Sequence, residues 1–148
     1  MVTAASLAGK NVLLTGGTGF VGRHVLPRLL ESGACVTCLV RGRSRVEDLP
    51  PAVSVAQADL LSGQGLEDAL DGQDVVIHMA ALLFGLGWQD YLGANALAAR
   101  SMAGALERLK MWGGGPARVV LVSSLAATGP GARLPGVGDD APCAPVSA

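Results

Sequence analysis

Residues 15–22, with the sequence TGGTGFVG, leave little freedom in the choice of fold. A short apolar run precedes them and a segment with helical spacing follows, so they predict a strand, a turn and a helix. In such a turn Gly16 permits the tight bend, Gly19 lets the backbone approach a pyrophosphate, and Gly22 lets the helix pack closely on the strand. The N–H groups at the start of the helix then bind the anion. The alternative is a glycine-rich turn that binds nothing.

Short apolar runs alternate with helical segments along the rest of the chain. The predicted strands are Asn11–Thr15, Ala34–Val40, Val53–Gln57, Val75–Met79 and Arg118–Ser123, and the predicted helices are Phe20–Ser32, Gly65–Leu70 and Tyr91–Lys110. The apolar stripe expected on the last helix is Leu92, Ala96, Ala99, Ala103 and Leu106. This alternation predicts an α/β fold with a doubly wound parallel sheet of about five strands in the order 3-2-1-4-5.

Composition decides between a buried sheet and a membrane protein. Half of the 148 residues are apolar, 16% are charged, and the mean hydropathy is +0.44. A membrane span needs roughly 20 continuous apolar residues, whereas the apolar runs here are as short as Val12–Leu14 and Val119–Val122. Strands buried on both faces of a parallel sheet explain this composition, and we expect no membrane association.

Several function classes receive no support from the sequence. Met1–Lys10 does not have the pattern of a secretory signal. Cys35 and Cys38 lie in a predicted strand without a second ligand pair, so we expect small buried hydrophobic residues and no metal site. The three cysteines fit a reducing cytoplasm. A net charge of −1 without a basic stripe argues against nucleic acid.

The end of the second predicted strand bears on cofactor choice. A carboxylate there suits the ribose 2′-hydroxyl of NAD, whereas a basic residue suits a 2′-phosphate. Residues 41–45 read RGRSR, and the first acidic residue is Glu47. Arg41 is the candidate to stack on adenine and pair with the phosphate, assisted by Arg43 or Ser44. The alternative is a solvated basic loop. We expect NADP(H) in preference to NAD(H).

Thr15 followed by Gly16-x-x-Gly19-x-x-Gly22 resembles the fingerprint of the extended short-chain dehydrogenase/reductases, the NAD(P)-dependent epimerase/dehydratase group. The resemblance implies a Rossmann-type domain whose bound nicotinamide exchanges hydride with an alcohol or carbonyl substrate, such as a nucleotide sugar or a sterol-like alcohol. In this family specificity comes mainly from a C-terminal part. We therefore expect residues 1–148 to be a truncated NAD(P)-binding domain, with the substrate-binding part absent and the sheet incomplete on its C-terminal side.

The resemblance also assigns roles to residues after the strands. Asp59 would bind the adenine amine and Leu60 the adenine ring, although Asp59 has the alternative role of a helix cap. Residues 79–81 would line the ribose and nicotinamide, and His78 is interpreted as structural. The cofactor-binding residues expected from this comparison are Gly16, Thr18, Gly19, Phe20, Val21, Gly22, Arg41, Asp59, Leu60, Met79, Ala80, Ala81, Asn95 and Ser123.

The catalytic site implied by the resemblance is incomplete. Ser124 matches the serine whose hydroxyl holds the substrate oxygen, while in the family a tyrosine exchanges the proton and a lysine lowers the pKa of that tyrosine. Asn95 matches an asparagine that supports the active-site backbone, although residues 98–99 are Ala-Ala where relatives often have Gly-Thr. The sequence has no Tyr-x-x-x-Lys motif, since four residues after Tyr91 stands Asn95.

Three interpretations remain open at the level of the sequence. The chain is the N-terminal fragment of an NAD(P)-dependent enzyme, with the 82–89 loop bordering the substrate pocket. Alternatively, it is a non-catalytic dinucleotide-binding module, either a sensor or a subunit that binds another chain. The partners expected besides the cofactor are a homodimer partner or a second chain that completes the fold. The third interpretation is an unstable remnant with bare apolar surface. We expect the first interpretation, with catalysis absent from this chain alone.

Overall fold

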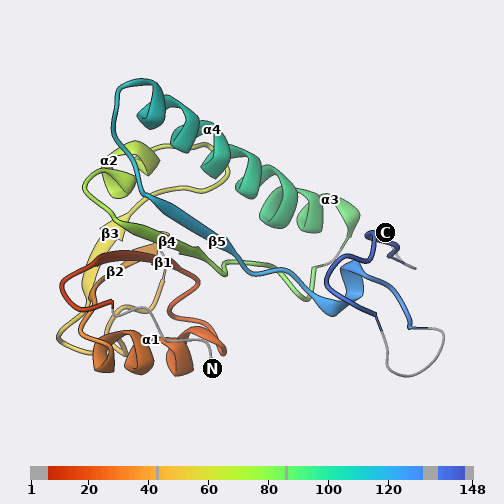
Figure 1. The fold of residues 1–148 in the computed structure, drawn as a ribbon, viewed down its shortest axis with the longest axis horizontal. Helices are drawn as coiled ribbons and strands as arrows, with labels where there is room; N and C mark the ends of the chain where they lie inside the picture. The colour runs from red at the N-terminus through yellow and green to blue at the C-terminus, as the bar shows by residue number, and fades with distance from the viewer. Residues whose placement is uncertain (1–6, 43, 86, 132–136, 146–148) are drawn as a thin grey trace.

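The computed structural model describes residues 7–42, 44–85, 87–131 and 137–145. At its centre is a five-stranded parallel sheet with the order β3-β2-β1-β4-β5 (Figure 1). The strands are β1 (Asn11–Thr15), β2 (Cys35–Val40), β3 (Ser54–Gln57), β4 (Val75–His78) and β5 (Arg118–Leu121). The predicted fold class and strand order are confirmed, and each predicted strand lies within about two residues of its observed bounds.

Helices cover both faces of the sheet. They are α1 (Gly22–Glu31), α2 (Leu66–Leu70), α3 (Trp88–Tyr91), the π-helix η1 (Leu92–Leu97), α4 (Ala98–Met111) and the 3₁₀ turn η2 (Leu125–Ala127). Helix α1 lies against one face, and α2 and α4 lie against the other (Figure 1). None of the helices in the described part of the chain is long and apolar enough to cross a membrane.

The two faces of the sheet produce two hydrophobic clusters. Successive residues of a strand point to opposite faces, so Val12 and Leu14 pack with α1 whereas Leu13 packs with α2 and α4. All three side chains are fully buried. The unbroken apolar run in β1 therefore reflects a strand covered on both sides.

An ion pair and two hydrogen bonds join the start of β1 to the residues just before β4, at the amino edge of the sheet. The Lys10 ammonium lies 3.0 Å from one carboxylate oxygen of Asp74, and the Asn11 amide donates to the other oxygen at 2.9 Å. The Asn11 side chain also donates to the Gly72 carbonyl. The Asn11 amide, and then Lys10, hold the pKa of the Asp74 carboxyl below its usual range.

The long helix differs from the sequence prediction in both continuity and orientation. Residues 91–110 were predicted as one α-helix, but 92–97 form a π-helix, which has a wider turn. The residues of α4 that face the sheet are Ala98, Met102 and Ala105, whereas Ala96 and Ala103 of the predicted stripe are exposed. Leu106 of the predicted stripe is partly buried and packs against the same core, so the predicted stripe is only partly wrong. Apolar residues on more than one face of this helix satisfy the same spacing rule.

The prediction that Cys35 and Cys38 are buried holds only for Cys38. Cys35 and Cys143 are exposed, whereas Cys38 is fully buried and desolvation raises its thiol pKa to about 11. Cys38 lies on the α1 face of β2, together with Val36 and Val40. Cys35 is the first residue of the strand and points to the opposite face, ahead of the part that α2 and α4 cover.

Strand β5 forms one edge of the sheet and is exposed along its length. Val119 and Leu121 retain 45% and 61% of their accessible surface. The strand pairs only with β4 in the described residues, and α4 packs mainly on strands nearer the centre. An apolar strand edge is therefore open to solvent.

Candidate functional site

The carboxyl ends of the five strands lie along one edge of the sheet, and the predicted site segments gather there. Thr15 of β1 is level with Leu39 of β2 and His78 of β4, and His78 is level with Leu121 of β5. The segment that follows each strand therefore emerges beside its neighbours. This is where doubly wound folds bind ligands, at the point between β1 and β4 where the strand order reverses.

The turn after β1 has the conformation that its glycines predict. Gly16 has φ +76°, and a Cβ at this position would meet the Ala80 backbone at 2.9 Å. The Gly19 amide closes the turn by donating to the Gly16 carbonyl at 3.0 Å. A Cβ on Gly22 would overlap the carbonyl oxygens of Gly16 and Gly17. Gly16 and Gly22 are therefore required by packing, independently of any ligand.

Gly19 has a different environment from the other two glycines. A Cβ there would have a single close neighbour, the Gly16 carbonyl oxygen at 3.2 Å, and otherwise open space. Directly after it, the backbone amides of Phe20 and Val21 have no acceptor among the described residues. Both side chains point outward, with 72% and 55% of their surface exposed. The turn therefore presents free donors and an unfilled space at the positive end of the α1 dipole.

A buried hydrogen-bond network joins the glycine turn to the end of β4. The hydroxyl of Thr15 accepts the amide protons of Met79 and Ala80, at 3.2 and 3.0 Å, and lies 2.7 Å from Nδ1 of His78. Since the hydroxyl oxygen already accepts two bonds, its own proton goes to Nδ1, and His78 is neutral with its proton on Nε2. Burial lowers the pKa of His78. As predicted, His78 is a structural group.

The end of β2 places Arg41 beside the segment after β3. The Arg41 amide donates a hydrogen bond to the hydroxyl oxygen of Ser44, which lies 3.1 Å away. Its exposed guanidinium is close enough to Asp59 to contribute to the lowered pKa of that carboxyl. Ser44 is therefore used in holding the loop, and Arg43 lies outside the described residues.

Asp59 and Leu60 follow β3, and their side chains differ in how far a ligand could reach them. One carboxylate oxygen of Asp59 accepts the amides of Ser62 and Leu61, at 2.8 and 2.7 Å, and these two bonds are the main cause of its lowered pKa. This carboxylate therefore stabilises a turn by accepting backbone amides, as a helix cap does, and a helix cap was the alternative role expected of Asp59. Leu60 is 9% exposed and belongs to the core. A small part of its side chain is available to an adenine ring.

Asn95 supports the backbone after β4, with both amide atoms engaged. Its oxygen accepts the Leu82 amide at 2.7 Å, and its nitrogen donates to the Leu82 carbonyl at 3.0 Å. The π-helix η1 carries it, and such turns occur frequently at functional sites. Asn95 thereby positions residues 80–82. The second N–H of its nitrogen and the second lone pair of its oxygen are not used in these bonds, and the cofactor contact expected of Asn95 stays a prediction.

Tyr91 anchors the neighbouring loop, a role that the sequence does not predict. Its hydroxyl accepts the Gly85 amide at 2.9 Å and lies 3.3 Å from the Leu83 carbonyl. A cavity of about 260 Å³ is lined by Trp88, Tyr91, Leu92, Asn95 and Ala96. No local sequence pattern reveals this anchor, because the loop has to fold back on the helix for the hydroxyl to reach it.

Ser123 and Ser124 follow β5 and are both exposed. The Ser124 hydroxyl accepts the Ala126 amide at 3.2 Å and caps η2, which continues away from the sheet (Figure 1). The two serines lie at the predicted edge of the sheet. Neither has a histidine, tyrosine or lysine as a hydrogen-bond partner among the described residues.

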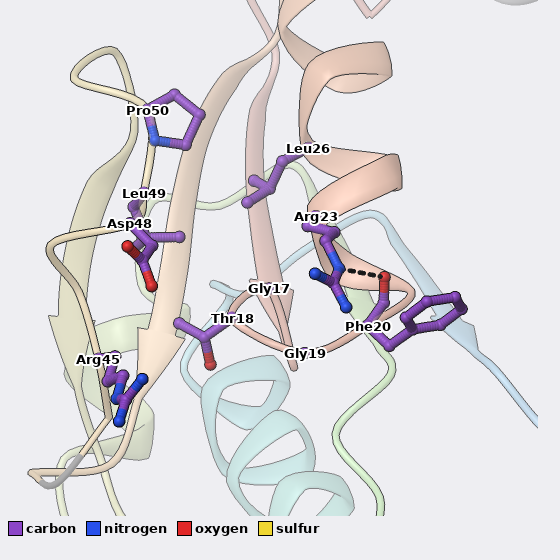
Figure 2. A pocket seen from close by; sticks show the side chains of 10 residues that line it. All are labelled: Gly17, Thr18, Gly19, Phe20, Arg23, Leu26, Arg45, Asp48, Leu49 and Pro50. Carbon is purple, nitrogen blue, oxygen red and sulfur yellow. Dashed lines mark hydrogen bonds between the residues drawn. The ribbon is translucent and has the colours of Figure 1, made fainter.

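A cavity of about 420 Å³ opens beside the glycine turn (Figure 2). Residues 17–19, the first turns of α1 and the 45–50 segment form its walls. Arg23, Arg45 and Asp48 line it, and none of these three is among the site residues predicted from the sequence. Only the path of the β2–β3 connection brings the last two toward α1. Within the described residues no cluster of three metal-ligating side chains occurs.

Comparison with known proteins identifies the family. The profile of the NAD dependent epimerase/dehydratase family matches residues 12–148, almost the whole chain. The chain belongs to the NAD dependent epimerase/dehydratase family. Members of this family are NAD(P)-dependent epimerases, dehydrogenases and reductases, so the resemblance noted in the sequence is confirmed.

Among curated members of the epimerase/dehydratase family, a 2-alkyl-3-oxoalkanoate reductase from Shewanella oneidensis is 30% identical over 143 residues. The alignment covers 94% of this chain and 35% of the reductase. Among solved structures, MoeE5 in complex with UDP-glucuronic acid and NAD is 31% identical, with a TM-score of 0.71, covering 93% of this chain and 44% of MoeE5. A UDP-galactose 4-epimerase is 25% identical, with a TM-score of 0.75, covering 93% and 45%. The chain thus spans less than half the length of these relatives.

Proposed function

We propose that this chain binds NADP(H) at the carboxyl edge of its sheet, as the dinucleotide-binding part of an oxidoreductase or epimerase/dehydratase. The observation that carries the proposal is the turn after β1, where the Phe20 and Val21 amides have no acceptor among the described residues and the space beside the Gly19 Cα is unfilled. A pyrophosphate supplies the acceptors that these donors lack. The family match supports a dinucleotide as the source of that pyrophosphate.

The residues along the edge of the sheet fit the remainder of such a cofactor. Arg41 and Asp59 lie on the adenine side of the turn. On the other side, Thr15 fixes the backbone of Met79 and Ala80, whose small and flexible side chains leave room for ribose and nicotinamide. When bound, the nicotinamide supplies the hydride chemistry, and the protein contributes binding and orientation.

The preference for NADP(H) over NAD(H) rests on charge. The segment after β2 has Arg41 and Arg45, and the carboxylate of Asp59 is occupied by backbone amides. A carboxylate that accepts the ribose 2′-hydroxyl is the usual mark of an NAD site. Cations without such a carboxylate at the end of β2 favour the phosphorylated cofactor.

We further propose that these 148 residues alone do not catalyse turnover. The single tyrosine of the sequence, Tyr91, uses its hydroxyl on the 83–85 backbone, and Lys10 pairs with Asp74 at the opposite edge of the sheet. Ser124 therefore has no proton-transferring partner in the described residues. The substrate, in a complete protein of this family, would be a sugar nucleotide or another alcohol or carbonyl compound. The cavity beside Tyr91 would border it.

Equilibrium titration of the purified chain with NADPH and NADH tests the proposal. We expect saturable binding of both, with NADPH the tighter ligand, and no oxidation of NADPH in the presence of sugar-nucleotide or ketone substrates. A folded chain that binds neither dinucleotide would overturn the proposal. Turnover by the chain alone would overturn the claim about catalysis and leave binding intact.

A further inference from the structure

Gly17 is a glycine of the turn whose identity the backbone conformation does not explain. Gly16 has a positive φ, whereas the φ of Gly17 lies outside the left-handed region that favours glycine. Gly17 is nevertheless buried, and an added Cβ there would lie 2.5 Å from the sulfur of Cys38. Non-bonded carbon atoms prefer separations of about 3.5–4.0 Å. Glycine is therefore required at position 17 by the side chain that packs beneath it.

The other neighbours of Gly17 leave room for a methyl group. The nearest atoms after the sulfur are Cδ2 of Leu14 at 3.3 Å and Cδ1 of Leu26 at 3.6 Å. Both are terminal methyl groups of flexible side chains, one in β1 and the other in α1, and small rotations move them aside. Among the neighbours that the structure describes, Cys38 alone comes too close for any residue but glycine.

Cys38 has little freedom to move away from the turn. It is fully buried on the α1 face of β2, level with Leu14 of β1 and Val55 of β3. Because β2 is hydrogen-bonded to a strand on each side, its backbone cannot shift without disturbing both pairs. Burial raises the pKa of the thiol to about 11, so the side chain is uncharged at neutral pH. Cys38 therefore acts on Gly17 through its volume.

The turn above this thiol presents the donors proposed for the pyrophosphate. Two residues after Gly17, the Gly19 amide closes the turn on the Gly16 carbonyl at 3.0 Å. The next two amides, those of residues 20 and 21, have no acceptor among the described residues. A displacement of Gly17 moves these amides as well, and hydrogen bonds weaken steeply when distance and angle depart from their optimum.

We infer that Cys38 is a positioning residue of the proposed dinucleotide site, whose sulfur supports Gly17 from the face of the sheet and sets the height of the turn. The two positions are complementary, because the thiol leaves room for a hydrogen at position 17 and for nothing larger. This role rests on the proposed function, since the height of the turn matters for binding only if the turn holds a dinucleotide. Cys38 is fully buried and has no surface to offer the cofactor.

A double-mutant cycle between positions 17 and 38 tests this coupling. Gly17→Ala should weaken NADPH binding at least about tenfold, because the new methyl group pushes the turn away from the sulfur. Cys38→Ala alone should weaken it about two- to threefold, and in the double variant it should restore most of the affinity lost in Gly17→Ala. Normal affinity in Gly17→Ala would overturn the inference. A double variant as weak as Gly17→Ala would also overturn it, by assigning the glycine requirement to the cofactor itself.

Enlarged side chains separate positioning of the turn from general packing of the core. Cys38→Leu and its matched control Val36→Leu both overpack the α1 face of β2, but Val36 is level with Val12, farther from the turn. Both variants should melt at a lower temperature, and only Cys38→Leu should weaken NADPH binding, by about tenfold. Equal affinities in the two folded variants would make Cys38 an ordinary core residue.

Hydrogen exchange at the Gly19 amide distinguishes failure of this role from failure of the proposed function. The measurement needs no ligand and reports how firmly the turn is closed. Faster exchange in Gly17→Ala that slows again in the double variant supports control of the turn by Cys38, even if neither dinucleotide binds. Identical exchange in all variants refutes it, even if dinucleotides bind. If Gly17→Ala does not fold, the comparison of Cys38→Leu with Val36→Leu decides.

Discussion

Gly19 and Gly22 belong to one turn but have different surroundings. At Gly22 an added Cβ would overlap two carbonyl oxygens of the turn, whereas at Gly19 it would touch one oxygen and otherwise fill the space assigned to the pyrophosphate. Gly22→Ala should therefore lower the free energy of unfolding by about 2 kcal/mol. Gly19→Ala should remain folded and lose NADPH affinity at least about tenfold. Urea denaturation and NADPH titration of both variants separate the two effects, and normal affinity in Gly19→Ala would contradict the pyrophosphate assignment.

The Thr15 hydroxyl serves three partners at once, which makes it sensitive to substitution. Thr15→Val keeps the shape of the side chain but leaves Nδ1 of His78 and the Ala80 amide without their partner, while the Met79 amide keeps its bond to the Thr15 carbonyl at 3.3 Å. We expect the free energy of unfolding to fall by about 2 kcal/mol. Thr15→Ser retains the hydroxyl and should cost much less. If the valine and serine variants unfold at the same denaturant concentration, the hydroxyl has no such role.

His78 gives the stability of the fold a specific pH dependence. Burial lowers its pKa below the value of about 6.5 that it has in the unfolded chain. Below this pH the unfolded state takes up a proton that the native state does not bind, so stability falls as the pH decreases through the interval between the two pKa values. Denaturation measured at a series of pH values should show this loss, and His78→Asn should reduce the slope. An unchanged slope in that variant would exclude His78 as its source.

The single residues that the sequence predicted well are those with local requirements. Gly16 and Gly22 are determined by a turn between adjacent elements, so spacing was sufficient. Arg23 and Arg45 are separated along the chain. They line the same cavity only because the β2–β3 connection lies across that cavity from the start of α1. Leu60 lies mainly in the core, and its contact with adenine stays a prediction from the resemblance. Contacts of these kinds depend on tertiary packing, which spacing does not encode.

At the scale of the elements, the π-helix η1 determines where Asn95 points. Replacing Asn95 by alanine removes both of its bonds to Leu82, whereas Asn95→Asp keeps the acceptor for the Leu82 amide and loses the donor. Hydrogen exchange at Leu82 should accelerate strongly in Asn95→Ala and less in Asn95→Asp. Exchange that is equally slow in both variants would show that other contacts hold this segment.

The strands were predictable because their apolar runs are short, continuous and bounded by turn residues. The long helix was harder, because alanine, leucine and methionine occupy more than one of its faces. Any three- and four-residue stripe among them satisfies the periodicity. The wide π turn between residues 92 and 97 also changes the angular offset between Leu92 and α4, and no residue in LGANAL signals it.

The whole molecule has a well-packed centre and an open apolar margin. Val119, Val120 and Leu121 are exposed on the edge strand β5, together with Leu125 in η2. Unpaired, apolar strand edges promote association. We expect the isolated chain to self-associate with increasing concentration in sedimentation velocity experiments. Leu121→Lys should reduce this tendency, whereas Val46→Lys, at an exposed loop position, should not. A chain that stays monomeric at all accessible concentrations would show that the exposed edge of β5 does not drive association.

The strand pair β1–β4 is stabilised by different interactions at its two ends, an ion pair at one and a neutral hydrogen bond at the other. At the amino end, Lys10 and Asp74 are partly solvent-exposed charges, and dissolved ions screen their attraction. At the carboxyl end, Thr15 and His78 form a neutral, buried contact that ions do not reach. Ionic strength therefore weakens the Lys10–Asp74 pair at the end remote from the proposed dinucleotide site, and mild acid, too weak to protonate Asp74, acts first on the His78 contact at the other end. A change of buffer alone selects which end of this pair opens first.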